Sequence, residues 1–183
     1  MSNTICLDER YSTTKLLTKK KPEIVKNGEG KFQSVLFLPE AEGRKGEGGL
    51  RAKGYFKKSY EDKPLVSIIT VVYNGEKFLE ETIQSVISQT YENVEYIIID
   101  GGSTDGTLDI IKRYEDKIDY WISEKDKGIY DAMNKGIDVA SGEIIGLINA
   151  DDWYEKDTIN TVIKNYSGDK NFDIFHGNLN YIN

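Results

Sequence analysis

Two adjacent carboxylates, Asp151 and Asp152, are the residues best suited to chemistry in this sequence of 183 residues. They follow a short apolar run at 143–149, so two like charges meet just past an expected buried strand and favour a counter-cation. Hard oxygen ligands suit Mg²⁺ or Mn²⁺, which also bind diphosphate oxygens. The alternative is a helix N-cap ahead of Glu155, which would explain one aspartate but not two. The pair therefore predicts a divalent-metal site.

Polar side chains also follow the other apolar runs, where strands are expected to end. Asp100 ends the run VEYIIID and precedes Gly101 and Gly102, which let backbone approach a ligand closely. Asp100 is either a turn residue or a carboxylate that accepts a hydrogen bond from a base or ribose. Ser103 or Thr104 is predicted to cap the next helix. Ligands of open α/β sheets bind beyond the carboxyl ends of strands, so the strand-end residues should converge. They are Tyr73, Asn74, Asp100, Asp126, Asn149, Asp151 and Asp152.

A few other residues have both a structural and a functional interpretation. Asp131 and Asn134 are three apart and share a helix face, where both could simply be solvated. Lys127, near the start of that helix, could meet phosphate or be exposed. His176 is the single histidine, which argues against a histidine triad or a His-rich metal site. No G-x-G-x-x-G follows the first strand and no Walker sequence is present.

A regular alternation of apolar patterns begins after Pro64, and it predicts the elements that must position these residues. Strands are expected at 66–73, 94–100, 119–123 and 143–149, with a further extended segment at 172–181. Helices are expected at 76–88, 105–114, 128–140 and 155–166. The alternation predicts an α/β fold with a mostly parallel sheet flanked by helices. Three strands, 66–73, 94–100 and 143–149, are expected to be central.

Residues 1–63 lack this pattern, and we expect them to form a basic, partly irregular N-terminal extension to a domain at 64–183. SVLFL at 34–38 predicts one short strand, and five glycines within 43–54 predict a loop or linker. The extension holds 14 Lys and Arg against 9 Asp and Glu, a net of +5, whereas residues 64–183 carry −12. A solvated lysine-rich segment is expected, with peripheral contact to an anionic membrane as the alternative. The acidic body argues against nucleic-acid binding.

Composition places the chain among globular proteins, with 38% hydrophobic and 30% charged residues. No apolar stretch approaches the ~20 residues of a membrane helix, and the N-terminus has no signal-peptide pattern. Cys6 is the single cysteine, so an internal disulfide cannot form. These features predict a cytoplasmic location.

Two segments together resemble the N-terminal half of the catalytic domain of family 2 glycosyltransferases, which has the GT-A fold. They are PLVSIITVVYNGEKFLEETIQSVISQTYENVEYIIIDGGSTDGT and DKGIYDAMNKGIDVASGEIIGLINADDWY, and they cover over a third of the chain. The resemblance implies a Rossmann-like GT-A domain over 64–183 that is incomplete at its C-terminal end. It also implies a nucleotide-diphosphate sugar as donor, often a UDP-sugar.

The resemblance assigns expected roles to four residues around the nucleotide. Thr70 and Tyr73 would border the base and ribose. Asp100 would accept a hydrogen bond from the pyrimidine ring. Asp126 lies where relatives often have an Asn that contacts the base.

Asp151 and Asp152 fall on the family's metal motif. The resemblance implies that Asp152 directly binds Mg²⁺ or Mn²⁺, while Asp151 supports the ribose or the metal shell. The motif usually has a further acidic residue where this chain has Asn149. The sequence thus departs from the family pattern at one position of the expected metal site.

A second departure lies on the helix expected at 128–140. Many relatives have Arg immediately before the residue that matches Asn134, whereas this chain has Met133. The change removes a cation that could meet the diphosphate. Lys127 or Lys135 is the expected replacement, and Lys127 and Asn134 are counted among the donor-binding residues.

The mechanism implied by the resemblance is a single displacement that inverts the anomeric carbon, with a carboxylate base on the acceptor hydroxyl and a metal on the departing diphosphate. In the family that base lies well beyond the metal motif, and 31 residues follow Asp152 here. We therefore expect the base to lie beyond Asn183 and the chain to be a fragment or a natural truncation. Asp169 and Asp173 are the alternative bases. An open sheet edge would favour homo-oligomers.

The sequence is compatible with three functions. The first is a sugar transferase of cell-surface polysaccharide or glycolipid synthesis, which acts on a lipid-linked or saccharide acceptor at the inner face of the membrane. The second is a nucleotide-sugar-binding module without turnover. The third is another nucleotide-binding α/β protein, such as a nucleotidyltransferase, although that class usually has a Gly-rich, basic loop after its first strand.

Overall fold

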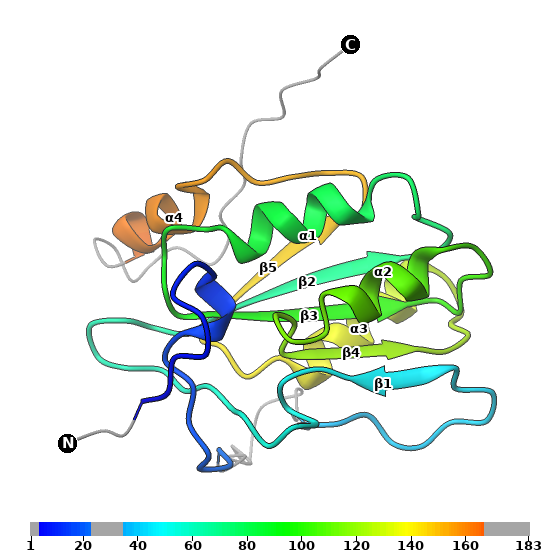
Figure 1. The fold of residues 1–183 in the computed structure, drawn as a ribbon, viewed down its shortest axis with the longest axis horizontal. Coiled ribbons are helices and arrows are strands. Elements are labelled where there is room, and N and C mark those ends of the chain that lie inside the picture. Colours follow the sequence, from blue (N-terminus) through cyan, green and yellow to red (C-terminus); the bar gives the residue numbers. More distant parts are fainter. Residues whose placement is uncertain (1–3, 23–34, 167–183) are drawn as a thin grey trace.

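The computed structural model describes residues 4–22 and 35–166 of the chain. Its centre is a five-stranded sheet with the order β1-β4-β3-β2-β5 (Figure 1). Strands β2 to β5 run parallel, and β1 pairs antiparallel with β4. The strands are β1 (Gly46–Gly48), β2 (Val66–Val72), β3 (Val94–Asp100), β4 (Tyr120–Ser123) and β5 (Ile144–Asn149). The helices are the 3-10 helix η1 (Ser12–Thr14), α1 (Leu79–Ile87), α2 (Thr107–Arg113), α3 (Ile129–Val139) and α4 (Thr158–Tyr166). The predicted α/β class and mostly parallel sheet are confirmed.

Strands β2 and β3 form the centre of the sheet because their sequences are apolar on both faces. Every residue of the two strands is buried. Their parallel register places Ile69 beside Ile97 and Thr70 beside Ile98. A strand covered on both faces has no need of polar alternation, which explains the β-branched runs in the sequence.

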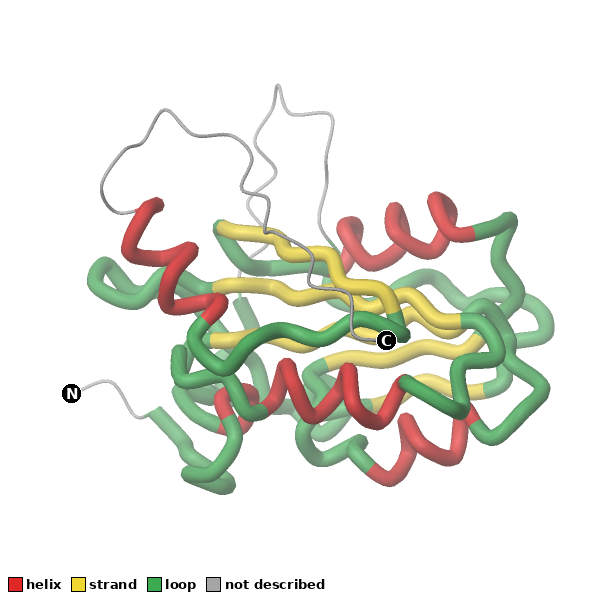
Figure 2. Tube along the Cα trace, turned by 90° about the horizontal axis from the view of Figure 1, so that it is seen from above, coloured by secondary structure: helices red, strands yellow, loops and turns green. Residues whose placement is uncertain are grey.

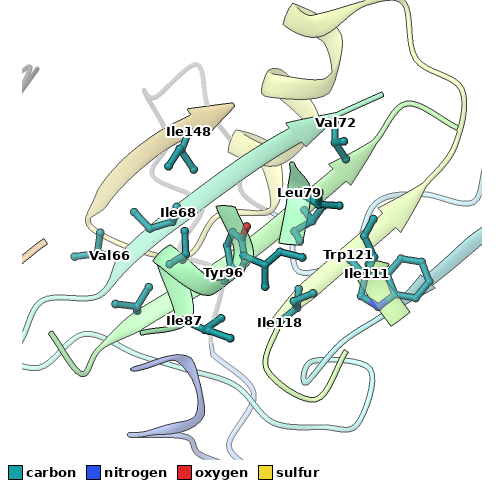
Figure 3. Packing of buried hydrophobic residues seen from close by; sticks show 14 of the residues in the cluster. Val66, Ile68, Val72, Leu79, Ile87, Tyr96, Ile111, Ile118, Trp121 and Ile148 are labelled. Carbon is teal, nitrogen blue, oxygen red and sulfur yellow. The ribbon is translucent and has the colours of Figure 1, made fainter. Parts of the chain in front are cut away.

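Helices cover both faces of the sheet, as Figure 2 shows. One hydrophobic cluster joins α1, α2 and α4 to the first face, where Leu79 and Ile87 of α1 lie near Ile68 and Tyr96 (Figure 3). The second cluster joins α3 to the other face. There Gly136 lets the helix approach closely, because a Cβ at this position would lie 2.4 Å from Cγ2 of Ile69.

Strand β1 corrects the expectation that 43–54 is only a loop or linker. Residues Gly46–Gly48 pair with β4, with Gly46 opposite Ser123 and Gly48 opposite Trp121. The glycines are required by packing, since a Cβ on Gly48 would lie 2.7 Å from Nε1 of Trp121. The strand therefore uses glycine to admit an indole ring, so it has none of the apolar alternation by which strands are recognised.

Two further expectations about strands differ from the structure. Residues 35–38 form no strand; the backbone N of Val35 donates to the Asp138 carbonyl, and Phe37 packs against the cluster under α3. The apolar run thus covers a core face instead of joining the ladder. Among the described residues, β5 lies at an edge of the sheet and not at its centre, and its side chains alternate in burial. The segment expected at 172–181 lies outside the described residues, as do His176, Asp169 and Asp173.

The described part of 1–63 packs tightly against the sheet and its helices. The Ser12 hydroxyl donates to the carbonyl oxygens of Val86 and Ile87 at the end of α1, each at 3.1 Å. Arg51, 3% exposed, places Nη2 2.5 Å from Oε1 of Glu95, a buried residue of β3. The division of the chain at residue 63 stays a prediction. Among the described residues, no helix has the length and apolar character needed to cross a bilayer.

Candidate functional site

A pocket of about 650 Å³ lies at the carboxyl ends of the parallel strands. This volume is in the range of small-molecule sites. It is lined by the end of β2, by the loop that follows β3 and by the start of α3 with the loop before it. The lining residues include Val71, Val72, Tyr73, Gly101, Gly102, Lys125, Asp126, Gly128, Ile129 and Ala132. The pocket therefore lies at the edge where strand-end residues were expected to converge.

Asp126 is the acidic residue in the pocket wall. Its Oδ1 accepts a hydrogen bond from the backbone N of Gly128 at 2.8 Å, which fixes the turn into α3. Its Oδ2 lies against Gly101, where a Cβ would come within 2.5 Å of that oxygen. The missing side chain of Gly101 thus makes room for a carboxylate that arrives from another loop.

Asp100 and Thr70 face the interior, not the pocket. The Asp100 side chain is fully buried and accepts hydrogen bonds from the backbone N and hydroxyl of Ser103 and from the Ser123 hydroxyl. The Thr70 hydroxyl lies 3.0 Å from the hydroxyl of buried Tyr96. Both residues support the strand ends that carry the pocket, and their contact with a ligand stays a prediction.

Tyr73 and Asn74 form the loop that follows β2. The Tyr73 side chain lines the pocket and is 65% exposed. Asn74 has a positive φ of 52°, and its Oδ1 accepts from the backbone N of Thr104 at 2.8 Å. Its own backbone N donates to the Ser103 hydroxyl at 2.7 Å. Asparagine tolerates this left-handed conformation well, so the loop after β2 is tied to the loop after β3.

This arrangement corrects the predicted cap of α2. Ser103 and Thr104 form hydrogen bonds with Asn74 in the loop after β2 and do not cap the helix. The N-cap position is Gly106, which makes no side-chain cap hydrogen bond, and Asp105 just before it accepts from the backbone N of Thr107 at 3.0 Å through Oδ1. Ser, Thr and Asp in succession suggest a side-chain cap, but the chain path decides where the helix begins.

Lys127, just before α3, and Lys135, in the middle of α3, differ in their ion-pair partners. Lys135 Nζ lies 2.8 Å from Glu124 and 3.5 Å from Asp131, so its charge is already paired. Lys127 is exposed and has no ion-pair partner among the described residues. Asn134 is also exposed and lies outside the pocket lining. Of the two lysines, Lys127 remains available to a phosphate.

Asp151 and Asp152 lie just beyond the end of β5, the strand beside β2. Asp151 is exposed, while Asp152 is partly exposed and its Oδ2 accepts from the side-chain amide of Asn149 at 3.2 Å. Neither aspartate has an ion-pair partner in the described part of the chain. They do not line the pocket, and no group of three or more His, Cys, Asp or Glu residues with metal-site geometry occurs in 4–22 and 35–166.

Two residues of the pocket wall were missed from the sequence. Gly43 and Lys45 line it, and both precede the first parallel strand by about twenty residues. They come from the segment read as a glycine-rich linker. The one signal in the sequence was the local basic charge, which does not indicate where a segment packs.

Comparisons with known proteins agree with this geometry. The family model of glycosyl transferase family 2 matches residues 67–182. A candidate teichuronic acid biosynthesis glycosyltransferase of Bacillus subtilis, TuaG, is 42% identical over 101 residues, which cover 53% of this chain and 40% of that protein. Glycosyltransferase GlyA of Streptococcus pneumoniae is 33% identical over 102 residues, 54% of this chain and 14% of that protein. The chain thus spans at most about two fifths of either relative.

Solved structures give the same assignment of fold. Mannosyltransferase PcManGT from Pyrobaculum calidifontis, in complex with GDP-Man and Mn²⁺, matches with a TM-score of 0.54 and 27% identity over 57% of this chain and 33% of that chain. S. aureus TarS 1-349 in complex with UDP-GlcNAc matches with a TM-score of 0.53 and 26% identity, over 57% of this chain and 31% of that chain. The GT-A fold expected from the sequence is confirmed. Because the family model covers more than half of its length, the chain belongs to glycosyl transferase family 2.

Proposed function

We propose that the pocket binds the nucleotide part of a nucleotide-diphosphate sugar, and of a UDP-sugar in particular. The proposal rests on where the pocket and the two aspartates lie relative to the strands. The pocket opens at the ends of β2 and β3, and Asp151 and Asp152 stand at the end of the adjacent β5. A base and ribose in the pocket would place a diphosphate toward these aspartates. The complexes of similar structures with UDP-GlcNAc and with GDP-Man support a nucleotide-diphosphate sugar as the ligand.

The same proposal includes Mg²⁺ or Mn²⁺ as cofactor. Asp151 and Asp152 have no cationic partner among the described residues, so their adjacent charges suit a divalent cation. Two carboxylates fit a magnesium-type site, which usually takes its other oxygens from water and substrate phosphate. We propose Asp152 as the direct ligand and Asp151 as support. The metal would neutralise charge on the departing diphosphate.

We further propose transfer of the sugar to a hydroxyl with inversion, with a lipid-linked or saccharide molecule as acceptor in surface-polysaccharide or glycolipid synthesis. The name of the B. subtilis relative supports this class of product. The general base is proposed to lie outside the described residues. The alternative is a nucleotide-sugar-binding module that keeps the donor site without turnover.

The place of action is also a proposal. The net charge of +5 on residues 1–63 supports contact with an anionic membrane surface from the cytoplasmic side. Self-association along β5, an edge strand of the sheet in the described part of the chain, is proposed because unpaired strand groups seek partners. Vesicle sedimentation and analytical ultracentrifugation test these two points separately.

Turnover is tested by incubating the full chain with UDP-sugars, Mn²⁺ and lipid-linked acceptors. The proposed transferase activity predicts transfer of sugar to an acceptor. The alternative, a binding module without turnover, predicts donor binding with at most slow release of free sugar, because general-base assistance is typically worth ~10²–10⁴ in rate. If transfer occurs, Asp169→Ala and Asp173→Ala test whether either residue is the base. Absence of any nucleotide binding would contradict the proposed donor site itself.

A further inference from the structure

The segment that precedes the parallel sheet supplies part of the pocket wall. Lys45 lines the pocket, and both its backbone N and its side-chain Nζ donate hydrogen bonds. Its backbone N donates to the Ser123 carbonyl at 2.7 Å. Its Nζ donates to the carbonyl oxygens of Gly102 and Ser103, each at 2.9 Å. The side chain is therefore held against the loop that follows β3.

The neighbouring Arg44 makes this segment a fixed part of the site. Its Nε lies 2.9 Å from Glu124, and its Nη1 lies 2.7 Å from Glu47. Glu124 also pairs with Lys135 of α3. The arginine side chain is 13% exposed, so this pair of contacts is largely shielded from water. The segment is thus fastened to both the β4 end and α3.

The wall holds one hydrogen-bond donor and one acceptor that remain available. An ammonium group has three N–H donors, and two of those on Lys45 are taken by the carbonyls of Gly102 and Ser103. Asp126 Oδ1 accepts a hydrogen bond from the backbone N of Gly128. Its Oδ2 lies beside Gly101, which directly precedes Gly102 in the loop after β3. Neither Lys45 nor Asp126 has an ion-pair partner within the described residues. A cation and a carboxylate therefore both line the pocket, each beside one residue of the Gly101–Gly102 turn.

We propose that Lys45 and Asp126 together recognise the nucleotide base. The ammonium donates to a ring carbonyl oxygen, and the carboxylate accepts from the adjacent ring N–H. Uracil presents this carbonyl and N–H pair. Cytosine presents an amino group and an unprotonated nitrogen at the same positions, which sets donor against donor and acceptor against acceptor. The inference rests on the proposed function and adds the N-terminal segment as a specificity element.

Calorimetric titration of the full chain with UDP and CDP, at fixed Mg²⁺, tests the proposal. We expect the unchanged chain to prefer UDP by about tenfold or more, the effect of one well-placed charged hydrogen bond. Lys45→Met, which keeps an aliphatic stem, should weaken UDP about tenfold and leave CDP nearly unchanged. Asp126→Asn offers an amide N–H to the bare cytosine nitrogen, so it should raise CDP affinity relative to UDP.

Lys53→Met is the matched control, because Lys53 belongs to the same segment and pairs with Glu115 at the surface, 3.1 Å away and outside the pocket. It should bind both nucleotides as the unchanged chain does. Equal weakening of UDP and CDP by Lys45→Met would overturn the proposal, since Lys45 would then only support the loop. Wild-type affinities in Lys45→Met would overturn it too. Both results leave the proposed function intact, whereas failure of the unchanged chain to bind any nucleotide would overturn both.

Discussion

Asp100 illustrates how burial decides the role of a single residue. Its type and position predict either a turn residue or a ligand acceptor, and the sequence cannot separate these alternatives. The structure directs the carboxylate inward to Ser103 and Ser123, with no exposed surface. A strand-end aspartate can therefore shape a ligand site by holding its loop, whether or not it also meets the ligand.

Asp100→Ala tests this supporting role. The change leaves the donors of Ser103 and Ser123 without their acceptor, and each hydrogen bond to a charged group is worth about 1.5–3 kcal/mol. We expect the free energy of unfolding, measured in urea, to fall by about 2–4 kcal/mol. A variant with unchanged stability and a selective loss of UDP binding would show that Asp100 acts mainly on the ligand.

Gly101→Ala tests the position of the Asp126 carboxylate. The new Cβ would lie 2.5 Å from Asp126 Oδ2, so the carboxylate must move out of the pocket wall. We expect weaker UDP binding with little loss of stability. A double-mutant cycle with Asp126→Ala measures the coupling, because Gly101→Ala should have no further effect once Asp126 is removed. If the losses of UDP binding free energy were additive, Gly101 and Asp126 would act independently.

Sequence patterns identified the strand ends and the loops of this site, but not the orientation of their side chains. Tyr73 and Asp126 line the pocket, whereas Thr70 and Asp100 point into the core. Lys45 was missed altogether. Orientation at a strand end depends on which neighbouring loop offers a partner, and that information lies in contacts distant along the chain.

At the scale of elements, the parallel strands and helices were predictable because their apolar periodicity is strong. Strand β1 was not, since its glycines, which leave room for the Trp121 ring of the partner strand, show none of the apolar alternation typical of strands. The helices α1 and α4 begin three residues later than predicted, at Leu79 and Thr158. Periodicity fixes which face is apolar, while the first helical turn depends on local contacts.

Gly136→Ala tests the close approach of α3 to the sheet. Alanine normally stabilises a helix interior by about 0.5–1 kcal/mol relative to glycine. Here its Cβ would come within 2.4 Å of Ile69, and overpacking typically costs about 1–3 kcal/mol. We expect a net loss of about 1 kcal/mol in thermal or urea unfolding. Asp138→Ala, on the exposed side of α3, is the control and should change stability little. A stabilised Gly136→Ala would show that the helix shifts freely.

At the scale of the whole molecule, a buried ion pair joins the N-terminal segment to the sheet. Arg51 Nη1 also donates to the carbonyls of Leu36 and Val139, at 3.0 and 2.7 Å. Burial alone would raise the pKa of Glu95, but Arg51 and hydrogen bonds from Ser141 and Ser67 outweigh it and hold that pKa below its usual value. The segment thus depends on an ionised Glu95.

Arg51→Met should therefore destabilise the fold by about 3–5 kcal/mol at pH 7, because it leaves a buried carboxylate unpaired. A carboxyl whose pKa is lowered on folding stabilises the protein above its unfolded pKa, and this contribution is lost as pH falls through the folded value. The difference between the unchanged chain and the variant should shrink as pH falls toward the lowered folded pKa of Glu95, because protonation removes the unpaired buried charge in the variant. Lys53→Met, at a surface pair, should cost less than about 1 kcal/mol. A pH-independent difference would show that packing, not charge, joins the segment to the sheet.

In the proposed donor site, Asp152 after β5 would hold a divalent cation that neutralises charge on the nucleotide diphosphate. The most direct measurement is calorimetric titration of UDP into the full chain with Mn²⁺ and with chelator, for the unchanged protein, Asp152→Ala and Asp109→Ala. Asp109 is an exposed aspartate of α2, outside the pocket lining. The account predicts that Mn²⁺ strengthens UDP binding in the unchanged protein and in Asp109→Ala, and that the gain disappears in Asp152→Ala. The same metal dependence in all three proteins would contradict it.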